Sequence, residues 1–169
     1  MVTLIDLRRL MLGLCQRLAF APPLLARLVI GVVFTHSGWG KLHHLDQVTK
    51  FFASQGIPFP EIQAPFVACI ELFCGAFVLV GLATRLAAFP LIGTMVVALS
   101  TALASKVTGV NALFGLAEFL YIALLIQLIV GGAGVVSLDR VVANALERID
   151  AADRAEDLAA EALSRTARA

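Results

Sequence analysis

The chain has 169 residues, of which 60% are hydrophobic and 15% are charged. Soluble domains are typically about 45–50% apolar, so a water-soluble fold of this size could not bury so much apolar surface. The formal net charge of +1 excludes the strongly basic surface typical of nucleic-acid binding. We therefore expect a small all-α protein integrated in the lipid bilayer, with no separate soluble domain and no nucleic-acid partner.

Residues 1–21 have the pattern of an amphipathic helix. The apolar side chains that share one helical face are Leu4, Leu7, Met11, Leu14 and Leu18. Arg8, Arg9 and Arg17 lie away from that stripe, which predicts an interfacial helix on the membrane surface. Because Arg17 interrupts the apolar run, this segment is not expected to be a cleaved signal peptide.

Four apolar stretches follow, each about the length that crosses a bilayer. They cover residues 22–41, 64–82, 86–105 and 113–131. They predict a four-transmembrane-helix bundle over residues 22–137, with the 42–63 connection forming a short lid or re-entrant segment. Residues 138–169 are rich in Ala, Arg, Asp and Glu, which predicts a charged helical tail.

The distribution of Lys and Arg outside these spans predicts the orientation of the chain. The side that holds both termini and the 83–85 connection carries nine of them, and the opposite side carries three. By the positive-inside rule, both termini lie in the cytoplasm.

Ionisable side chains within the spans are the candidates for function, because each costs about 2.5–3.5 kcal/mol at the centre of a bilayer. At about 1.5 Å per residue, His36, Glu71 and Glu118 lie about 8, 10 and 8 Å from the outer ends of their spans. Arg27 and Gln127 lie near the inner end. Helical phase places Arg27, Gly31, Phe34, Gly38 and Lys41 on one face of the first span. His36 lies about 180° from Arg27 on that span.

Structural roles stay open for several of these groups. Arg27 is close enough to the headgroups to snorkel, and His36 can be a hydrogen-bonded packing residue. Lys41 and Arg85 stand at span ends, where basic residues commonly anchor helices. Small residues on the third span form a stripe suited to close helix packing, namely Thr94, Ala98, Thr101 and Ser105.

No sequence motif indicates a metal or an intrinsic cofactor. His36, His43, His44 and Glu71 lack the spacing of a metal site, and no phosphate loop, haem attachment motif or dinucleotide fingerprint occurs. The three cysteines include no CxxC pair, and we expect each to be a small buried apolar residue. They are Cys15, Cys69 and Cys74.

Three stretches together resemble the DoxX family of bacterial membrane proteins, over residues 24 to about 140. They are Arg27-Leu28-Val29-Ile30-Gly31 leading to Gly38-Trp39-Gly40-Lys41-Leu42, Glu71-Leu72-Phe73-Cys74-Gly75 running to Gly81-Leu82-Ala83-Thr84-Arg85, and Gly132-Ala133-Gly134-Val135-Val136-Ser137-Leu138-Asp139. The resemblance implies a four-helix protein of the bacterial inner membrane that works in redox chemistry with partner proteins. The matching polar residues are Arg27, Lys41, Glu71, Arg85 and Asp139.

The leading hypothesis is a membrane subunit that binds a quinone between its helices for a soluble or membrane-bound partner oxidoreductase. Quinone reduction consumes protons, for which Glu71, His36 and Glu118 are the candidates. The candidate cofactor contacts are Arg27, Lys41, Trp39 and Arg85. Two alternatives stay open, a scaffold that assembles a larger complex and a small transporter or proton pathway; a homo-oligomer is compatible with each.

Overall fold

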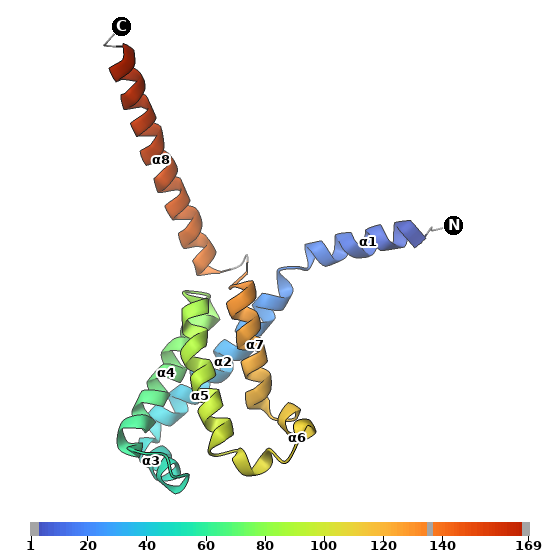
Figure 1. Ribbon diagram of the computed structural model, residues 1–169, viewed down its shortest axis with the longest axis vertical. Coiled ribbons are helices and arrows are strands. Elements are labelled where there is room, and N and C mark those ends of the chain that lie inside the picture. Colours follow the sequence, from blue (N-terminus) through green and yellow to red (C-terminus); the bar gives the residue numbers. More distant parts are fainter. Residues whose placement is uncertain (1–3, 135–136, 167–169) are drawn as a thin grey trace.

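The computed structural model describes residues 4–134 and 137–166, and within them the protein is entirely helical (Figure 1). Its elements are α1 (Leu4–Arg17), α2 (Ala21–His43), α3 (Leu45–Ser54), α4 (Pro60–Val80), α5 (Thr84–Ser100), a 3₁₀ turn (Ala104–Lys106), α6 (Val110–Phe114), α7 (Ala117–Gly131) and α8 (Leu138–Thr166). Val135 and Val136 of the third family motif lie outside the described residues, as do the two ends, 1–3 and 167–169.

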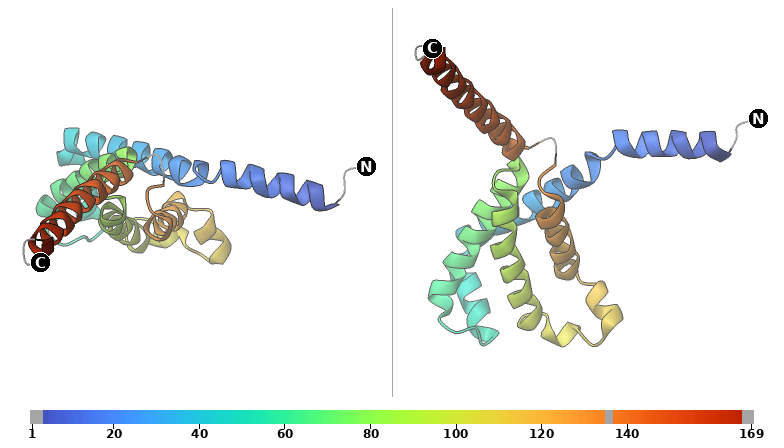
Figure 2. Two further views of the ribbon diagram at one scale, coloured as in Figure 1. Left: turned by 90° about the horizontal axis from the view of Figure 1, so that it is seen from above. Right: turned by 45° about the horizontal axis from the view of Figure 1, so that its top comes forward.

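Four helices form the body of the molecule. α2 packs most extensively against α4, α5 packs against α7, and further contacts join α4 to α5 and α2 to α7. The short helices α3 and α6 lie at one end of this bundle, whereas α1 and α8 project from the other (Figures 1 and 2). The helices predicted at both ends of the chain are therefore present, but both leave the bundle.

Sequence signals at helix ends explain where the central helices start and stop. Pro22 and Pro23 occupy the first turn of α2, and Pro60 opens α4, positions where proline's missing N–H costs nothing. α4 ends at Gly81, which adopts the left-handed conformation with φ of 72°. The Gly81 and Leu82 amides donate to the last carbonyls of α4, as in a Schellman cap. This tight end turns the chain straight into α5.

α2 and α4 approach each other backbone to backbone through small residues. A Cβ added at Gly38 would lie 2.3 Å from the Leu72 amide nitrogen, and one added at Gly75 would lie 2.7 Å from the Thr35 nitrogen. Small residues at such crossings let helices associate closely in membranes. The predicted face of α2 is confirmed, because its residues Arg27, Gly31, Phe34 and Gly38 are buried.

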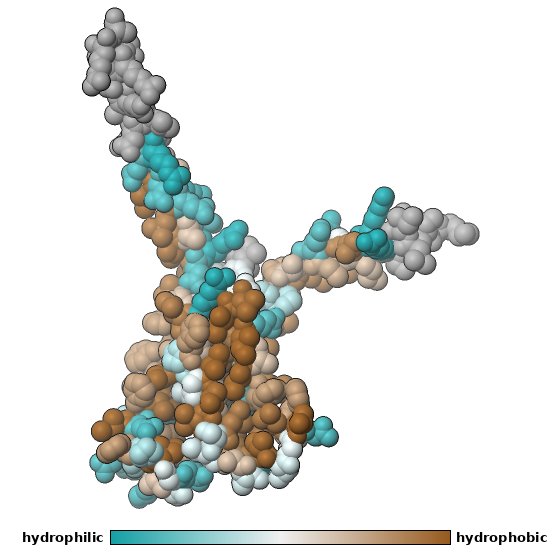
Figure 3. Space-filling model, viewed as in Figure 1, coloured by the Kyte–Doolittle hydropathy of each residue, from teal (hydrophilic) through white to brown (hydrophobic). Residues whose placement is uncertain are grey.

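The apolar core is small for so hydrophobic a chain. Its buried side chains centre on Ile30, Phe34, Leu91, Leu125 and Leu128. Many large apolar side chains are instead exposed around the outside of the bundle, among them Leu25, Val32, Phe73, Phe77, Leu86, Phe89, Leu120, Ile126 and Val130. In Figure 3 apolar residues cover much of the bundle, and hydrophilic residues gather along α1 and α8 and at the end that carries α3. An exposed apolar surface of this extent suits lipid.

Helix lengths agree with the predicted spans in two cases and differ in two. α2 and α4 are long and apolar enough to cross a membrane, whereas α5 and α7 have 17 and 15 residues. The predicted stretch 86–105 ends as an α-helix at Ser100, and 113–131 becomes continuous helix only at Ala117. The extended backbone of Leu116 separates α6 from α7, a break that hydrophobicity alone does not reveal.

One cysteine expectation is wrong. Cys15 is exposed, because α1 projects from the bundle and buries no face against it. Cys69 and Cys74 are partly buried free thiols on α4.

Candidate functional site

A cavity of about 920 Å³ lies between α2, α3, α4 and α5 and reaches the first turns of α7. Most of its wall is apolar or aromatic, with Phe34, Phe52, Phe66 and Tyr121 among the lining side chains. Pockets for small molecules and cofactors have this size and character, with a few polar groups that fix the ligand's orientation. The polar groups in this wall therefore define the site.

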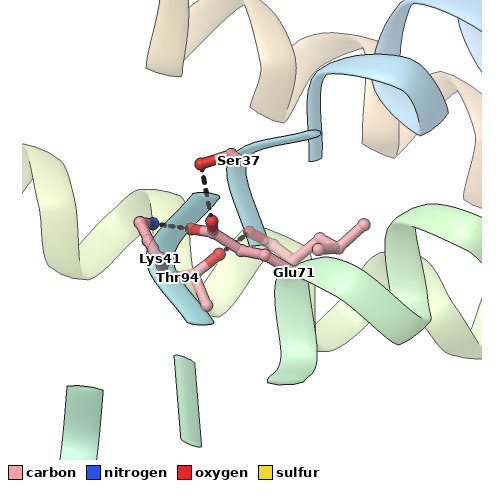
Figure 4. Close-up of polar contacts among 5 residues, drawn as sticks. Ser37, Lys41, Glu71 and Thr94 are labelled. Atoms are coloured by element: carbon pink, nitrogen blue, oxygen red, sulfur yellow. Dashed lines mark hydrogen bonds and ion pairs between the residues drawn. The ribbon is translucent and has the colours of Figure 1, made fainter. Parts of the chain in front are cut away.

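The central polar group is Glu71 of α4, whose side chain is almost fully buried. Its Oε1 accepts a hydrogen bond from Lys41 Nζ, and its Oε2 accepts one from the Ser37 hydroxyl at 2.8 Å (Figure 4). Ser37 and Lys41 are four residues apart, so they lie on one face of α2 opposite the carboxylate. Thr94 of α5 lies beside this group in Figure 4, its hydroxyl donating to the Leu91 carbonyl at 2.8 Å.

The two partners of the ion pair differ in accessibility. The Lys41 side chain is 27% exposed and the Glu71 side chain 2%. A buried carboxylate is costly without a countercharge, so Lys41 stabilises Glu71 in the bundle. Lys41, which lines the cavity, is the member of the pair that a ligand reaches more easily.

A second carboxylate faces the same cavity. Glu118 lies in the first turn of α7, is partly buried, and lines the wall together with Tyr121. The predicted site residues that meet at this cavity are thus Lys41, Glu71 and Glu118. Ser37 was missed by the sequence reasoning, although its position one turn before Lys41 could have indicated it.

The connection 42–63 closes one end of the cavity. α3 contacts α2 and α4, and it contributes Val48, Phe51 and Phe52 to the lining. Ile57, in the following turn, is buried and also lines the cavity. The connection that the sequence analysis described as a lid or re-entrant segment therefore lies against the cavity.

The small residues predicted to form a stripe on the third span border the cavity. Thr94 and Ala98 of α5, and Thr101 directly after its end, all line it. Their small volume leaves room between α5 and the α2–α4 pair. Ser105 lies beyond α5, in the 3₁₀ turn.

Four predicted site residues lie elsewhere, and three of them are exposed. His36 is exposed on the face of α2 opposite Arg27 and is not among the described side chains that line the cavity. Trp39 is 57% exposed and stacks against His43, with 4.5 Å between ring centroids. Arg85 is exposed at the far end of the bundle, where its guanidinium lies near Gly132.

Arg27 is buried near the start of α2 and is not among the described residues that line the cavity. Its Nε and Nη2 donate to the Val78 and Leu79 carbonyls at 3.1 and 3.0 Å, and its Nη1 donates to the Ala133 carbonyl at 3.0 Å. The last carbonyls of a helix lack intrahelical partners and carry partial negative charge. Arg27 therefore ties α2 to the end of α4 and to the segment after α7.

Asp139 completes this second polar cluster. Its carboxylate accepts hydrogen bonds from the Ala83 and Thr84 amides at 2.6 and 3.2 Å, which caps the start of α5. Its own amide donates to the Gly81 carbonyl at 2.9 Å. Residues from all three family motifs meet here. The cluster therefore gives these motif residues a structural role.

The described residues contain no group of three or more His, Cys, Asp or Glu side chains that could hold a metal ion. The polar groups in the cavity wall are the Lys41 ammonium group, the Glu71 and Glu118 carboxylates, several hydroxyl groups, the His44 imidazole and the side-chain amides of Gln47 and Gln63.

Fold and site together define a helical protein with an apolar exterior and a buried ion pair in the wall of an apolar cavity. The chain belongs to the DoxX family. The family's model matches residues 23–104. CatD of Bacillus subtilis, a protein provisionally named as an oxidoreductase, is 34% identical over 119 residues, which are 69% of this chain and 83% of that protein. The resemblance predicted from the motifs is confirmed.

A further relative is the uncharacterised membrane protein Rv3486 of Mycobacterium tuberculosis. It is 41% identical over 71 residues, which span 41% of this chain and only 44% of the mycobacterial protein. No solved structure matches the chain. Together with the family assignment, these relatives identify the chain as a membrane protein.

Proposed function

We propose that α2, α4, α5 and α7 cross a bacterial inner membrane, with both termini in the cytoplasm and α1 on the membrane surface. The apolar exterior of the bundle and the projection of α1 and α8 from one end support this topology. At 1.5 Å per residue, α5 and α7 are about 26 and 22 Å long, somewhat short of a hydrocarbon core of about 30 Å. The segment between them completes the crossing on the outer side.

We propose further that the chain is a quinone-binding membrane subunit of a redox system. The observation that carries this proposal is the cavity that combines aromatic walls with the Lys41–Glu71 pair. A quinone has an apolar ring and two carbonyl oxygens that accept hydrogen bonds, so it matches such a wall. The provisional oxidoreductase name of CatD supports redox chemistry in this family.

Each polar group has a distinct role in the proposed reaction. Reduction of a quinone to a quinol takes up two electrons and two protons. Lys41 donates a hydrogen bond to one quinone oxygen, where negative charge develops during reduction. Glu71 is a positioning residue that holds the ammonium group of Lys41, and Glu118 supplies a carboxyl group for proton transfer. The electrons come from a partner oxidoreductase.

Binding of radiolabelled ubiquinone to the purified chain in lipid nanodiscs tests this proposal. A hydrogen bond from a charged donor contributes about 1.5–3 kcal/mol, so Lys41→Met should weaken binding about 10- to 100-fold. Glu71→Gln should also weaken binding, because Lys41 loses its anchor. Lys50→Met and Glu61→Gln are matched controls at exposed positions outside the cavity lining. Equal affinity of Lys41→Met and Lys50→Met for ubiquinone would show that the cavity is not a quinone site in which Lys41 donates a hydrogen bond.

A specific feature also favours a docking role for the tail. α8 carries the apolar side chains Leu138, Val142, Leu146 and Ile149 along one side, and all four are exposed. We propose that the partner oxidoreductase docks on this stripe. Truncation after Val142 keeps the Asp139 cap, and it should release the partner while leaving quinone binding intact. Retention of the partner by the truncated chain would exclude this docking role.

A further inference from the structure

The helices that form two walls of the cavity diverge along their length. α4 and α5 are joined by the tight turn at Gly81, and they separate toward the end that carries α3 (Figures 1 and 2). The cavity lies where they have separated. Pro90, Gly93 and Val97 of α5 line it, and so does Thr101 directly after the end of the helix. These residues follow helical spacing, so one continuous face of α5 lines the space.

The cavity reaches the outside of the bundle between these two helices. Phe66 of α4 and Val97 of α5 both line the cavity, yet they are 63% and 44% exposed. Gly93 lies one turn before Val97, lines the cavity and is also exposed. These three residues, here called the mouth, are all apolar.

Gly93 leaves a gap in the α5 wall of the cavity. Close packing against another helix does not account for a glycine at this position. A Cβ built at Gly93 has no atom of the described residues within 4 Å, whereas one built at Gly38 would meet another helix at 2.3 Å. Gly93 also lies inside a helix, where glycine is less favourable than alanine by about 1 kcal/mol. The absent side chain keeps the mouth open.

The depth of the mouth determines which medium it faces. At 1.5 Å per residue, Gly93 and Val97 lie about 14 and 20 Å along α5 from its start at Thr84. Those depths fall within a hydrocarbon core of about 30 Å. In the proposed topology the mouth therefore opens sideways into lipid rather than into water.

We propose that this mouth is a lateral portal through which a membrane-dissolved amphiphile enters the cavity from the bilayer. The polar headgroup lies at Lys41, and the hydrocarbon tail passes over Gly93 between Phe66 and Val97. This inference rests on the proposed function for the identity of the headgroup. It adds that the ligand is a quinone with a long isoprenoid tail, not a water-soluble quinone.

Gly93→Trp tests the portal, because a Cβ at this position meets no atom of the described residues within 4 Å and the indole beyond it should block the mouth. Val96→Trp is the matched control, since Val96 is 50% exposed on the same helix and is not among the described lining residues. Affinity is measured for full-length ubiquinone and for its headgroup without a tail. Gly93→Trp should weaken binding of full-length ubiquinone at least about 10-fold and change headgroup binding less than about 2-fold. Val96→Trp should change neither.

The possible failures are distinguishable. Equal binding of full-length ubiquinone by the two tryptophan variants overturns the portal and leaves the proposed function in place. A parallel loss of both ligands in Gly93→Trp places the headgroup at the mouth and also overturns the portal. No binding of either ligand by the wild-type chain overturns the proposed function, and the portal with it.

Discussion

Loss of Lys41 should destabilise the bundle more than loss of its partner. In Lys41→Met the carboxylate of Glu71 stays in place with a side chain only 2% exposed and without a countercharge. In Glu71→Gln the remaining ammonium group is 27% exposed and can turn toward the cavity. The hydrogen bond from Ser37 persists in Lys41→Met, but a hydroxyl group does not replace a countercharge.

The size of the expected loss of stability follows from the attraction between the Lys41 and Glu71 charges and from the burial of Glu71. Two unit charges about 4 Å apart attract by about 4 kcal/mol at an effective dielectric constant of about 20. Removing one partner of a buried pair typically costs about 3–5 kcal/mol. We therefore expect about 3–5 kcal/mol for Lys41→Met and about 1–3 kcal/mol for Glu71→Gln, the cost of an unsatisfied polar group.

The assay is a double-mutant cycle on the free energy of unfolding in mixed micelles. The double variant Lys41→Met with Glu71→Gln should be more stable than the sum of the single losses predicts, by about 2–3 kcal/mol. Additive losses, or a larger loss for Glu71→Gln than for Lys41→Met, would refute the reasoning that Lys41 neutralises a buried carboxylate.

Two further predictions concern the packing that surrounds the site. Arg27→Gln removes a charged donor from three carbonyls and should lower the free energy of unfolding by about 3 kcal/mol. The control Arg85→Gln, at an exposed position, should change it by less than about 0.5 kcal/mol. Similar losses in the two variants would contradict the role of Arg27. Gly38→Ala places a methyl group 2.3 Å from the Leu72 nitrogen and should cost about 1–3 kcal/mol or more. Gly40→Ala is its control, with open space at its Cβ among the described residues, and a thermal shift assay that ranks the two equally would contradict close α2–α4 packing.

Periodicity predicted the orientation of α2 because one helix fixes the phase of its own side chains. It placed Arg27, Gly38 and Lys41 on one face and His36 on the opposite face. In the structure Arg27 and Gly38 are buried, Lys41 is partly buried and His36 is exposed. The similar depths of His36 and Glu71, about 8 and 10 Å from the outer ends of their spans, nevertheless suggested a shared layer. Depth gives only the position of a residue along its helix. The helical phase of His36 places it on a face of α2 that points away from the cavity.

The pairing of Lys41 with Glu71 depends on the length of the lysine side chain as well as on Cα positions. Lys41 lies near the end of α2 and appeared suited to an interfacial anchor, but its flexible four-carbon stem brings the ammonium group back to Glu71. Lys41 and Glu71 were both candidate site residues in the sequence analysis. Their contact with each other depends on the close approach of α2 and α4.

The cavity and the second polar cluster could not be predicted from a single sequence. The cavity arises from the divergence of α4 and α5, and the role of Arg27 depends on where the segment around Ala133 returns to the bundle. Both are tertiary relations between distant segments. The family motifs indicated that these residues matter, but they did not separate Arg27 and Asp139 from Lys41 and Glu71.

The central claim is that the cavity beside Lys41 and Glu71 holds a quinone. The most direct test is to purify the chain from native membranes in a mild detergent and to quantify the retained quinones by mass spectrometry, for the wild-type protein and for Lys41→Met. We predict that the wild-type chain retains a long-tailed quinone near one molecule per chain and that Lys41→Met loses most of it. Recovery of phospholipid alone with the wild-type chain, or equal quinone in both proteins, would contradict the claim.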